Sequence, residues 1–426
     1  MQHQFSLSYA QNLDSNDPLS NYKEQFYVPC LQDKKAIYFL GNSLGLQPKT
    51  AQDEVMKIME GWANFGVEGF FLGKDPWLTY QQKITPLLCN IIGAQNQEIV
   101  TMNHLTVNLH LLMISFYQPT KTRYKIICEA KAFPSDQYAF QSQVKLHGLN
   151  AADVIIEVCP KEGTELITTD DILATIEAHK DSAALVLFSG VNYYTGQVFN
   201  IKIITDAAHK AGAYAGFDLA HAAGNIHLQL HNWQVDFACW CNYKYLNSGP
   251  GAIAGAFVHQ KHLNNKKIKR LEGWWGNDAA NRFKMGTTFT PSPSAESWAM
   301  STSPMMLLAT HKASLEIFAA ASFDNLITKS KALSAYLFFV LNHINQPEEK
   351  FSIITPANPD ERGCQVSLSI HKNAKAVFDR LLPLGIFADW REPNVIRVAP
   401  VPLYNSFEEI YIFVEILQQI LKAANV

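Results

Sequence analysis

The 426-residue chain has few charges, few cysteines and no long apolar run. Its seven cysteines are scattered and include no Cys-x-x-Cys pair, so neither a zinc site nor a thioredoxin-like motif is indicated. No apolar stretch is long enough to span a bilayer, and the polar opening lacks the apolar segment of a secretion signal. We therefore expect a cytoplasmic protein with no membrane segment and no metal.

Charged residues make up only 17% of the chain, and the net charge is −3. Without clustered Lys and Arg, a nucleic acid is a poor candidate partner, and the short basic run at 261–270 is better explained as a solvated surface segment. A hydrophobic fraction of 48% argues against disorder. The low charge fits surface hidden either in a large core or against a second copy of the chain, and composition does not separate the two. The length suggests two or three domains of about 150 residues each.

Short apolar runs alternate with helical patterns in the middle of the chain. They predict strands at 124–129, 154–158, 183–189, 214–218 and 235–241, and helices at 170–179 and 201–211. Thr169 or Asp170 is the expected cap of the first helix, and Gly212 is expected to close the second. Strands without polar alternation, separated by helices, predict an α/β fold with a mostly parallel sheet covered on both faces.

The pattern changes after about residue 294. Long helical patterns are followed by shorter elements, which predict helices at 304–321, 326–344, 374–382 and 407–423 and strands at 365–370 and 395–398. These elements predict a smaller C-terminal α/β domain, joined to the first domain through the helix at 304–321.

Three polar side chains follow the predicted strands. Ser189, Asp218 and Lys244 stand at or just after strand ends, and ligands of such sheets bind beyond the carboxyl ends of the strands. An acid beside a lysine suits pyridoxal phosphate, because the acid can keep the ring nitrogen protonated while the lysine forms a Schiff base. Alternatively, Lys244 is a surface lysine on a loop and Asp218 caps the next segment. His221 could stack on a ring, orient Asp218 or simply pack in the core.

Other segments could complete such a site. A phosphate could be held at 104–108, which opens a helical pattern, or at the glycine turn 248–252. Residues 133–136 offer an aromatic face beside a hydroxyl and a carboxylate. Arg397 lies in an apolar predicted strand, where it either grips a substrate carboxylate or forms an inward salt bridge in the small domain.

Segments along nearly the whole chain together resemble the kynureninase family, which consists of pyridoxal-phosphate hydrolases of fold type I. The segments are 38–46, 105–110, 129–136, 188–197, 216–222, 236–247, 273–276 and 396–405. The resemblance implies a large domain with a mostly parallel, seven-stranded sheet between helices and a smaller α/β C-terminal domain. It also implies the division into an N-terminal segment packing with the small domain (1–60), the cofactor domain (61–300), and a linking helix with the small domain (301–426).

The resemblance also implies a role for each matching residue. Lys244 carries the cofactor and moves protons, and Asp218 pairs with the ring nitrogen. Tyr243 binds the cofactor in its phosphate region and is an acid or hydrogen-bond donor at the substrate ketone oxygen. The further cofactor-binding residues are Leu105, Thr106, Phe133, Pro134, Ser135, Asp136, Ser189, His221, Trp274 and Thr302. Trp274 and Thr302 would come from the neighbouring subunit, so a homodimer with a shared active site is expected. Arg397, Asn42 and Ser43 would bind the substrate.

The implied activity is hydrolysis of L-kynurenine, or of its 3-hydroxy derivative, to anthranilate or 3-hydroxyanthranilate and L-alanine, in tryptophan catabolism and NAD synthesis. The loop at 66–73 differs from animal members, which leaves open the preference between the two substrates. A cysteine desulfurase-like enzyme, with Cys364 as its candidate nucleophile, or an aminotransferase is the alternative on the same fold. A binding protein without activity is a third interpretation.

Overall fold

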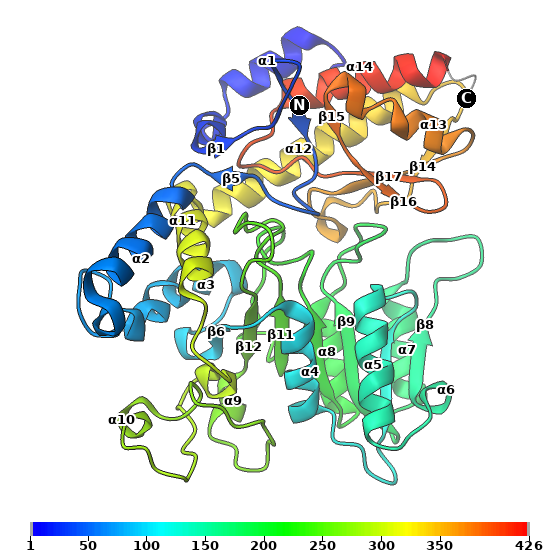
Figure 1. The fold of residues 1–426 in the computed structure, drawn as a ribbon. Coiled ribbons are helices and arrows are strands. Elements are labelled where there is room, and N and C mark those ends of the chain that lie inside the picture. Colours follow the sequence, from blue (N-terminus) through cyan, green and yellow to red (C-terminus); the bar gives the residue numbers. More distant parts are fainter. Residues whose placement is uncertain (1–2, 424–426) are drawn as a thin grey trace.

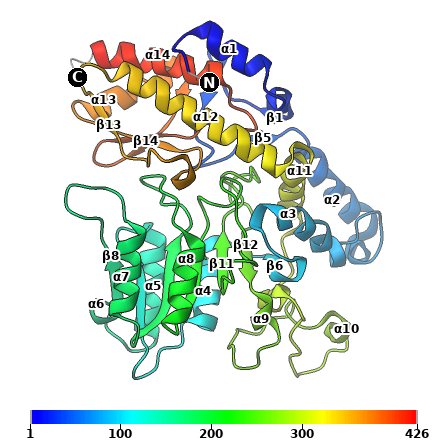
Figure 2. The same cartoon turned by 180° about the vertical axis from the view of Figure 1, so that it is seen from behind.

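The computed structural model describes residues 3–423 (Figures 1 and 2). A seven-stranded sheet forms the centre of the larger domain, in the order β6-β12-β11-β10-β9-β7-β8. The strands are β6 Ile99–Thr101, β7 Lys125–Glu129, β8 Ile155–Val158, β9 Ala183–Ser189, β10 Tyr214–Asp218, β11 Phe237–Trp240 and β12 Gly255–Val258. Neighbouring strands from β11 to β8 pair in parallel, and β12 is antiparallel to both β11 and β6. The predicted mostly parallel sheet of seven strands is confirmed.

Helices cover both faces of this sheet. Helices α4 (Leu105–Phe116) and α5 (Pro134–Leu146) lie on the face seen in Figure 1, while α7 (Thr169–Ala178) and α8 (Ile201–Lys210) lie on the face seen in Figure 2. Successive residues of β7 face the two sides: Ile126 packs in the core beneath α4 and α5, and Ile127 in the core beneath α7 and α8. Burial on both faces explains why the interiors of the central strands β7, β9, β10 and β11 are apolar.

The predicted elements of the large domain are present, but the sequence analysis did not predict β6, β12 or α5, and it misplaced one helix cap. The N-cap of α7 is Thr168, whose side chain accepts the backbone N–H of Asp171, so the prediction of Thr169 or Asp170 was wrong. Strand β12 was missed because it is four residues long and begins with Gly255, which gives little strand signal. A Cβ at Gly255 would lie 2.2 Å from the Trp240 ring, so close packing demands glycine there. Gly212, with φ of 74°, follows α8 as predicted.

The C-terminal domain is a four-stranded antiparallel sheet packed against helices. Its strands are β13 Phe351–Ile353, β14 Val366–Ile370, β16 Asp389–Arg391 and β17 Val395–Val398, in the order β13-β14-β17-β16. The helices are α11 Met305–Ala321, α12 Phe323–Ile344, α13 Ala374–Asp379 and α14 Phe407–Ala423. The predicted strands β14 and β17 and all four predicted helices are confirmed within a few residues.

The N-terminal segment lies against both later parts of the chain. Helix α1 (Leu7–Ser15) packs on α14, and the Asp14 carboxylate accepts the first backbone N–H groups of that helix at 2.8 Å. Strand β4 (Ile37–Tyr38) pairs with β15 (Ile386–Phe387), whereas α2 (Ala51–Phe65) packs on α11. The contacts of α1 and β4 agree with an N-terminal segment that packs on the small domain, although a boundary at residue 60 would fall within α2. The division into 1–60, 61–300 and 301–426 stays our proposal.

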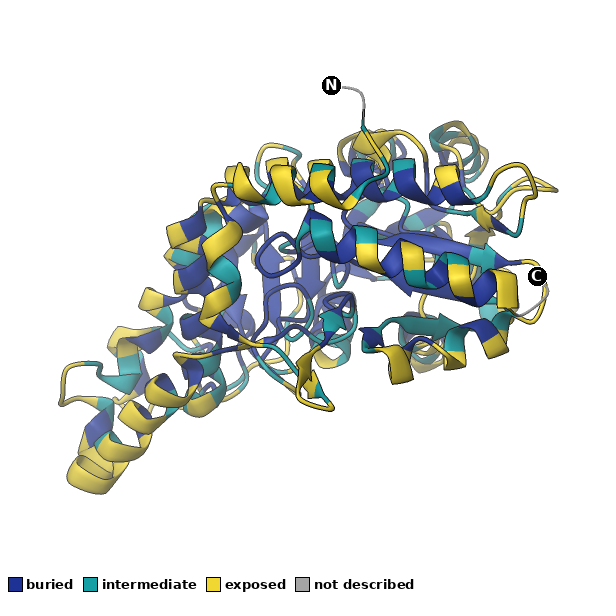
Figure 3. Ribbon diagram, turned by 90° about the horizontal axis from the view of Figure 1, so that it is seen from above, coloured by how far each residue is buried: buried dark blue, intermediate teal, exposed yellow. Residues whose placement is uncertain are grey.

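The remaining elements are short. They comprise strands β1 Phe26–Tyr27, β2 Cys30–Leu31, β3 Lys34–Lys35 and β5 Gln47–Pro48, and helices α3 Thr85–Ile92, α6 Ala151–Val154, α9 Gln260–Leu263 and α10 Ala279–Arg282. Seen from above, the sheet is buried and the outer faces of the helices are exposed (Figure 3). Among residues 3–423, no helix is both long enough and apolar enough to cross a membrane.

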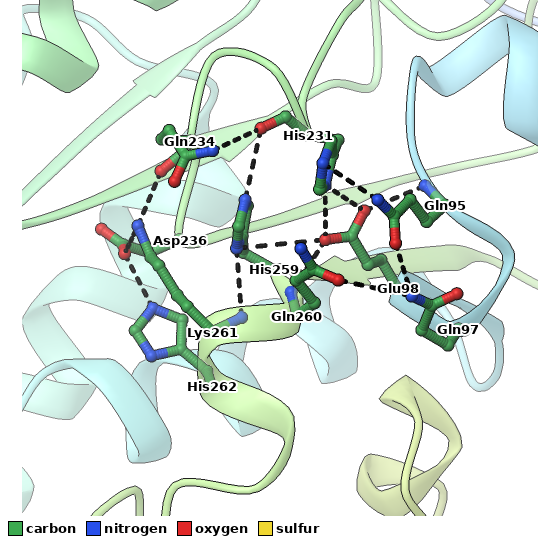
Figure 4. Close-up of polar contacts among 10 residues, drawn as sticks. All are labelled: Gln95, Gln97, Glu98, His231, Gln234, Asp236, His259, Gln260, Lys261 and His262. Atoms are coloured by element: carbon green, nitrogen blue, oxygen red, sulfur yellow. Dashed lines mark hydrogen bonds and ion pairs between the residues drawn. The ribbon is translucent and has the colours of Figure 1, made fainter.

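A buried carboxylate clamps the amino-terminal edge of the sheet. Asp236, just before β11, lies 2.8 Å from His262 Nε2 and Lys261 Nζ (Figure 4). It also lies 2.8 Å from His209 Nε2 and accepts the Ala215 N–H at 2.7 Å. Burial alone would raise the pKa of Asp236, but hydrogen bonds from the two histidines and the charge of Lys261 outweigh it and hold the pKa well below its usual value. The clamp joins α8, β10, β11 and α9.

Glu98, His231 and His259 form a second clamp beside the first (Figure 4). The three side chains lie close enough to hold a metal ion. However, Glu98 accepts His231 Nδ1–H at 3.0 Å and the N–H groups of Gln95 and Gln260 at 2.9 and 2.8 Å. His259 Nδ1 accepts a backbone N–H at 3.2 Å, and the two imidazoles stack in parallel at 5.1 Å. Because hydrogen bonds occupy these acceptors, the geometry describes a structural clamp.

We expect Asp236→Asn to lower the free energy of unfolding at neutral pH by about 3 kcal/mol, because it leaves the Lys261 ammonium and two imidazole donors without the buried carboxylate that joins them. Asp206→Asn removes an exposed partner of Lys202 and should cost less than about 1 kcal/mol in the same urea titration.

The difference in unfolding free energy between wild type and Asp236→Asn should depend on pH. The pKa of Asp236 is depressed in the folded state, so its contribution is present above the unfolded value of about 4 and is lost as the pH falls through the folded value. The difference between wild type and Asp236→Asn should shrink from pH 5 towards pH 3. A difference that grows in acid would contradict this assignment.

Candidate active site

A cavity of about 210 Å³ opens at the carboxyl ends of the parallel strands. It is lined by Leu105, Thr106, Glu129, Phe133, Ser135, Asp136, Ser189, Val191, Tyr193, Asp218, Ala220, His221, Tyr243 and Lys244. The structure thus brings together most of the predicted cofactor-binding residues, from strands and helices far apart in sequence. Pro134 is the first residue of α5 and does not line the cavity itself.

Lys244 lies in the loop after β11 and points into this cavity. Its Nζ is 3.0 Å from His221 Nε2 and 5.8 Å from the centre of the Phe133 ring. Burial, together with the charges of Lys244 and Arg397, holds the pKa of His221 well below its usual value, so the imidazole is neutral at neutral pH. A neutral Nε2 accepts a hydrogen from the lysine. The alternative that Lys244 is merely a surface lysine is wrong.

Asp218 and Asp136 are buried carboxyl groups in the same cavity. Asp218 accepts the Ala220 N–H at 2.7 Å. Burial raises its pKa, although that hydrogen bond and the Lys244 charge act in the opposite direction. Burial also raises the pKa of Asp136, and the neighbouring Asp218 charge adds to the effect. The capping role considered for Asp218 is therefore present, but it coexists with a position facing the cavity.

Glu129 is a third acid in the cavity wall, and it had no assigned role in the sequence analysis. It ends β7 and accepts the Ser189 N–H at 3.0 Å and the Ser189 hydroxyl at 2.5 Å. Burial raises the pKa of Glu129 to about 7, against the lowering effect of the Ser189 hydrogen bonds. A charged residue at the end of an otherwise apolar strand was the signal that could have identified it.

The residues of the cavity fit pyridoxal phosphate. Lys244 can react with its aldehyde, a buried carboxylate can pair with its ring nitrogen, and the half-exposed Phe133 ring offers a stacking face. Helix α4 begins at Leu105, and His104 makes no side-chain cap, so its first N–H groups can hold a phosphate. Buried His221 Nδ1 and Asp136 Oδ1 have no hydrogen-bond partner in the described part of the chain, as expected of groups that await a ligand.

The second predicted phosphate cradle lies elsewhere. Ser248, Gly249 and Pro250 line a separate, largely apolar cavity of about 720 Å³ with residues 44–48 and 51–52. That prediction is therefore not supported, and the start of α4 is the better cradle.

Arg397 forms the inward salt bridge that was one of its two alternatives, and its contact with a substrate stays a prediction. It is buried in β17, forms an ion pair with Asp389 of the small domain, and donates from Nη1 to the Tyr193 carbonyl at 2.5 Å. Its Nε has no partner among the described residues. The inward salt bridge is thus present, yet Arg397 also contacts Tyr193, which lines the cavity.

Asn42 is connected to the Tyr193 carbonyl through the side chain of Gln365. It is buried, and its amide donates to Gln365 at 3.0 Å, which in turn donates to the Tyr193 carbonyl at 3.0 Å. Ser43 donates its N–H to Leu40 in a turn and does not line the cavity. Tyr243 lines the cavity, and burial raises the pKa of its hydroxyl, which therefore stays protonated.

Trp274 and Thr302 lie away from the cavity of the single chain. Trp274 is 43% exposed, and neither residue lines the space around Lys244. Cys364 also lies away from it, buried in the domain interior, where burial raises the pKa of its thiol to about 12. A thiol of that kind is a poor nucleophile, which argues against the desulfurase alternative.

Solved structures resemble this chain in fold. The apo cysteine desulfurase from Thermococcus onnurineus superposes with a TM-score of 0.74 at 16% identity, over 97% of this chain and 98% of the other. A K223A mutant of C-DES with glycine covalently linked to the PLP cofactor gives 0.73 at 16% identity, over 90% and 96%. At such identities the likeness establishes the fold, which confirms the predicted fold type I architecture.

Sequence relatives are much closer. The kynureninase of Flavobacterium psychrophilum is 54% identical over 98% of both chains, and the human kynureninase is 47% identical over 97% of this chain and 93% of its own. The profile of the kynureninase C-terminal domain matches residues 326–417. Identity at this level over nearly the full length shows that the chain belongs to the kynureninase family.

Proposed function

We propose that this protein hydrolyses L-kynurenine to anthranilate and L-alanine with pyridoxal 5′-phosphate as its cofactor. Family membership supports the substrate and the reaction. Within the molecule, the observation that carries the proposal is a single cavity holding Lys244, two buried carboxyl groups and the start of α4. These are the groups that an aldehyde, a pyridine nitrogen and a phosphate require.

Bound pyridoxal phosphate supplies an electron sink for the carbon atoms next to the substrate amine. Asp218 would hold the ring N–H, a charge-assisted hydrogen bond that a buried carboxylate favours. Lys244 would bind the aldehyde and, once the substrate amine replaces it, carry protons to and from substrate carbon. His221 keeps the lysine in place through the contact at 3.0 Å.

The reaction adds water to the substrate ketone and breaks the bond between the β and γ carbons. The hydroxyl group of water ends on the acyl carbon, which leaves as anthranilate, and a proton ends on the alanine carbon. Tyr243, protonated at neutral pH, would donate a hydrogen bond to the ketone oxygen as negative charge develops there. General acid–base help of this kind contributes typically ~10²–10⁴-fold.

Arg397 would hold the carboxylate of the amino-acid substrate, with Asn42 beside it. The free Nε–H of Arg397 supports this assignment, whereas the unpaired Oδ1 of Asn42 is an acceptor and would need a donor group of the substrate. Ser43 stays a proposed neighbour. Hydrolysis of 3-hydroxykynurenine is part of the proposal, as is a place in tryptophan catabolism and NAD synthesis.

We further propose a homodimer in which Trp274 and Thr302 complete the partner's site. Their absence from the cavity of a single chain supports this arrangement. Exposed apolar side chains on and after α2, including Met56, Trp62 and Phe71, offer surface for a second copy. The seven free cysteines suit a reducing compartment, which supports a cytoplasmic location.

We expect Lys244→Ala to lower kcat for L-kynurenine by at least about 10³-fold, because it removes both the nucleophile and the proton carrier. Anthranilate fluorescence measures the rate, and circular dichroism should show an unchanged fold. Lys202→Ala, on the exposed face of α8, serves as the matched control and should retain wild-type rates. Turnover by Lys244→Ala near the control's rate would remove the mechanism.

We expect Arg397→Lys to raise the KM for L-kynurenine about tenfold or more while changing kcat less. Lysine keeps the charge opposite Asp389 but loses the planar set of N–H donors that a carboxylate needs. Arg391→Lys, at the partly exposed second partner of Asp389, is the control and should leave KM within about twofold. Equal KM values for the two variants would limit Arg397 to its salt bridge.

We expect two inactive variants to complement each other if the active site is shared. Lys244→Ala and Trp274→Ala, unfolded together and refolded as a mixture, should recover about a quarter of wild-type activity, since half of the dimers are mixed and each has one complete site. Each variant refolded alone is the control. A mixture no more active than the controls would place Trp274 outside the partner's site.

A further inference from the structure

Glu129 is a buried acid in the cavity wall for which the proposed reaction has no direct use. Its side chain is 2% exposed, and both of its carboxyl oxygens contact Ser189. Ser189 also lines the cavity, and in the sheet register it lies opposite Asp218 of the neighbouring strand. Glu129 therefore lines the cavity and also holds the side chain of Ser189, a second lining residue.

The charge on Glu129 sets the direction of these hydrogen bonds. An ionised carboxylate only accepts, so whenever Glu129 is charged Ser189 donates both its backbone N–H and its hydroxyl hydrogen to it. The short distance of 2.5 Å between the hydroxyl and carboxyl oxygens is typical of such a charge-assisted bond. The hydrogen of Ser189 is thus turned away from the cavity, and the Oγ atom offers it only lone pairs.

A purely structural tie between β7 and β9 would not need an acid at this place. The negative charges of Asp218 and Glu129 each oppose the ionisation of another acid in the cavity, because Asp218 raises the pKa of Glu129 and Glu129 raises that of Asp136. An amide or a hydroxyl could join the two strands without that repulsion. Glu129 is a third acid beside Asp136 and Asp218, so we expect its role to require a group that only accepts hydrogen bonds.

We propose that Glu129 is a positioning residue that fixes the Ser189 hydroxyl as a hydrogen-bond acceptor toward the bound cofactor. This inference rests on the proposed use of pyridoxal phosphate. Glutamine at position 129 would keep the shape, but its amide can donate to Ser189 Oγ while its oxygen accepts the backbone N–H. That exchange would free the hydroxyl hydrogen to point into the cavity.

A double-mutant cycle tests this inference, with the dissociation constant of pyridoxal phosphate measured by quenching of tryptophan fluorescence. Glu129→Gln should weaken binding about tenfold, as should Ser189→Ala. The double variant should bind no more weakly than Ser189→Ala alone, because Glu129 then has no hydroxyl to orient. Glu129→Asp, which keeps an acceptor, should bind more tightly than Glu129→Gln.

Glu98→Gln is the matched control, since Glu98 is equally buried in the same domain and binds only structural partners (Figure 4). It should lower the melting temperature of the cofactor-free protein without changing the dissociation constant. The cofactor-free melting temperatures of the Glu129 variants show whether they fold.

Two outcomes would overturn the inference while leaving the proposed function intact. Additive effects in the double variant would mean that Glu129 acts by its charge alone, and an unchanged dissociation constant in Glu129→Gln would make it structural. Wild-type protein that binds no pyridoxal phosphate would instead remove the proposed function, and this inference with it.

Discussion

The burial of several acids around one lysine, at the carboxyl edge of a parallel sheet, is the constraint on which this structure depends. A carboxyl group costs free energy when it leaves water, and three of them lie beside a single ammonium group and a neutral histidine. The fold sustains this arrangement because each acid is anchored by a strand end or the first turn of a helix. Such a costly arrangement is typical of a functional site.

Buried acids at the two edges of the large sheet differ in their hydrogen-bond partners. At the amino-terminal edge, Asp236 and Glu98 are as buried as the cavity acids, yet nitrogen donors surround their oxygens. At the carboxyl edge, Asp136 Oδ1 and His221 Nδ1 have no partner in the described residues. Both edges contain buried acids and histidines, and His262 Nδ1 at the amino-terminal edge also lacks a partner among residues 3–423. Among these acids, however, only Asp136 at the carboxyl edge has a buried oxygen without a partner in the described residues.

Much of this site could be predicted because strands β9 and β10 are apolar up to the polar residue at their end. Strand β10 contains no polar residue buried in its interior, so Asp218 stands out at its end, and the same reasoning places Ser189 at the end of β9. The turn at 248–252 was a candidate phosphate site, but part of it lines a different cavity. A glycine-rich sequence alone does not indicate which cavity a turn borders. Glu129 escaped notice because its importance lies in a contact with Ser189, sixty residues away in the chain.

Other features could not be read from one chain's sequence for physical reasons. Arg397 was assigned either a salt bridge or a substrate contact; the structure shows the salt bridge with Asp389, and the Nε–H group has no partner among the described residues. Strand β12 depends on the close approach of Gly255 to Trp240, a tertiary contact that local propensity does not express. The proposed roles of Trp274 and Thr302 require a second subunit.

The most direct measurement is to add pyridoxal phosphate to the purified protein, reduce it with borohydride and map the labelled peptide by mass spectrometry. We predict a yellow protein that is bleached on reduction and a cofactor fixed to Lys244 alone. A label on another lysine, or none at all, would contradict the assignment of this cavity as the active site.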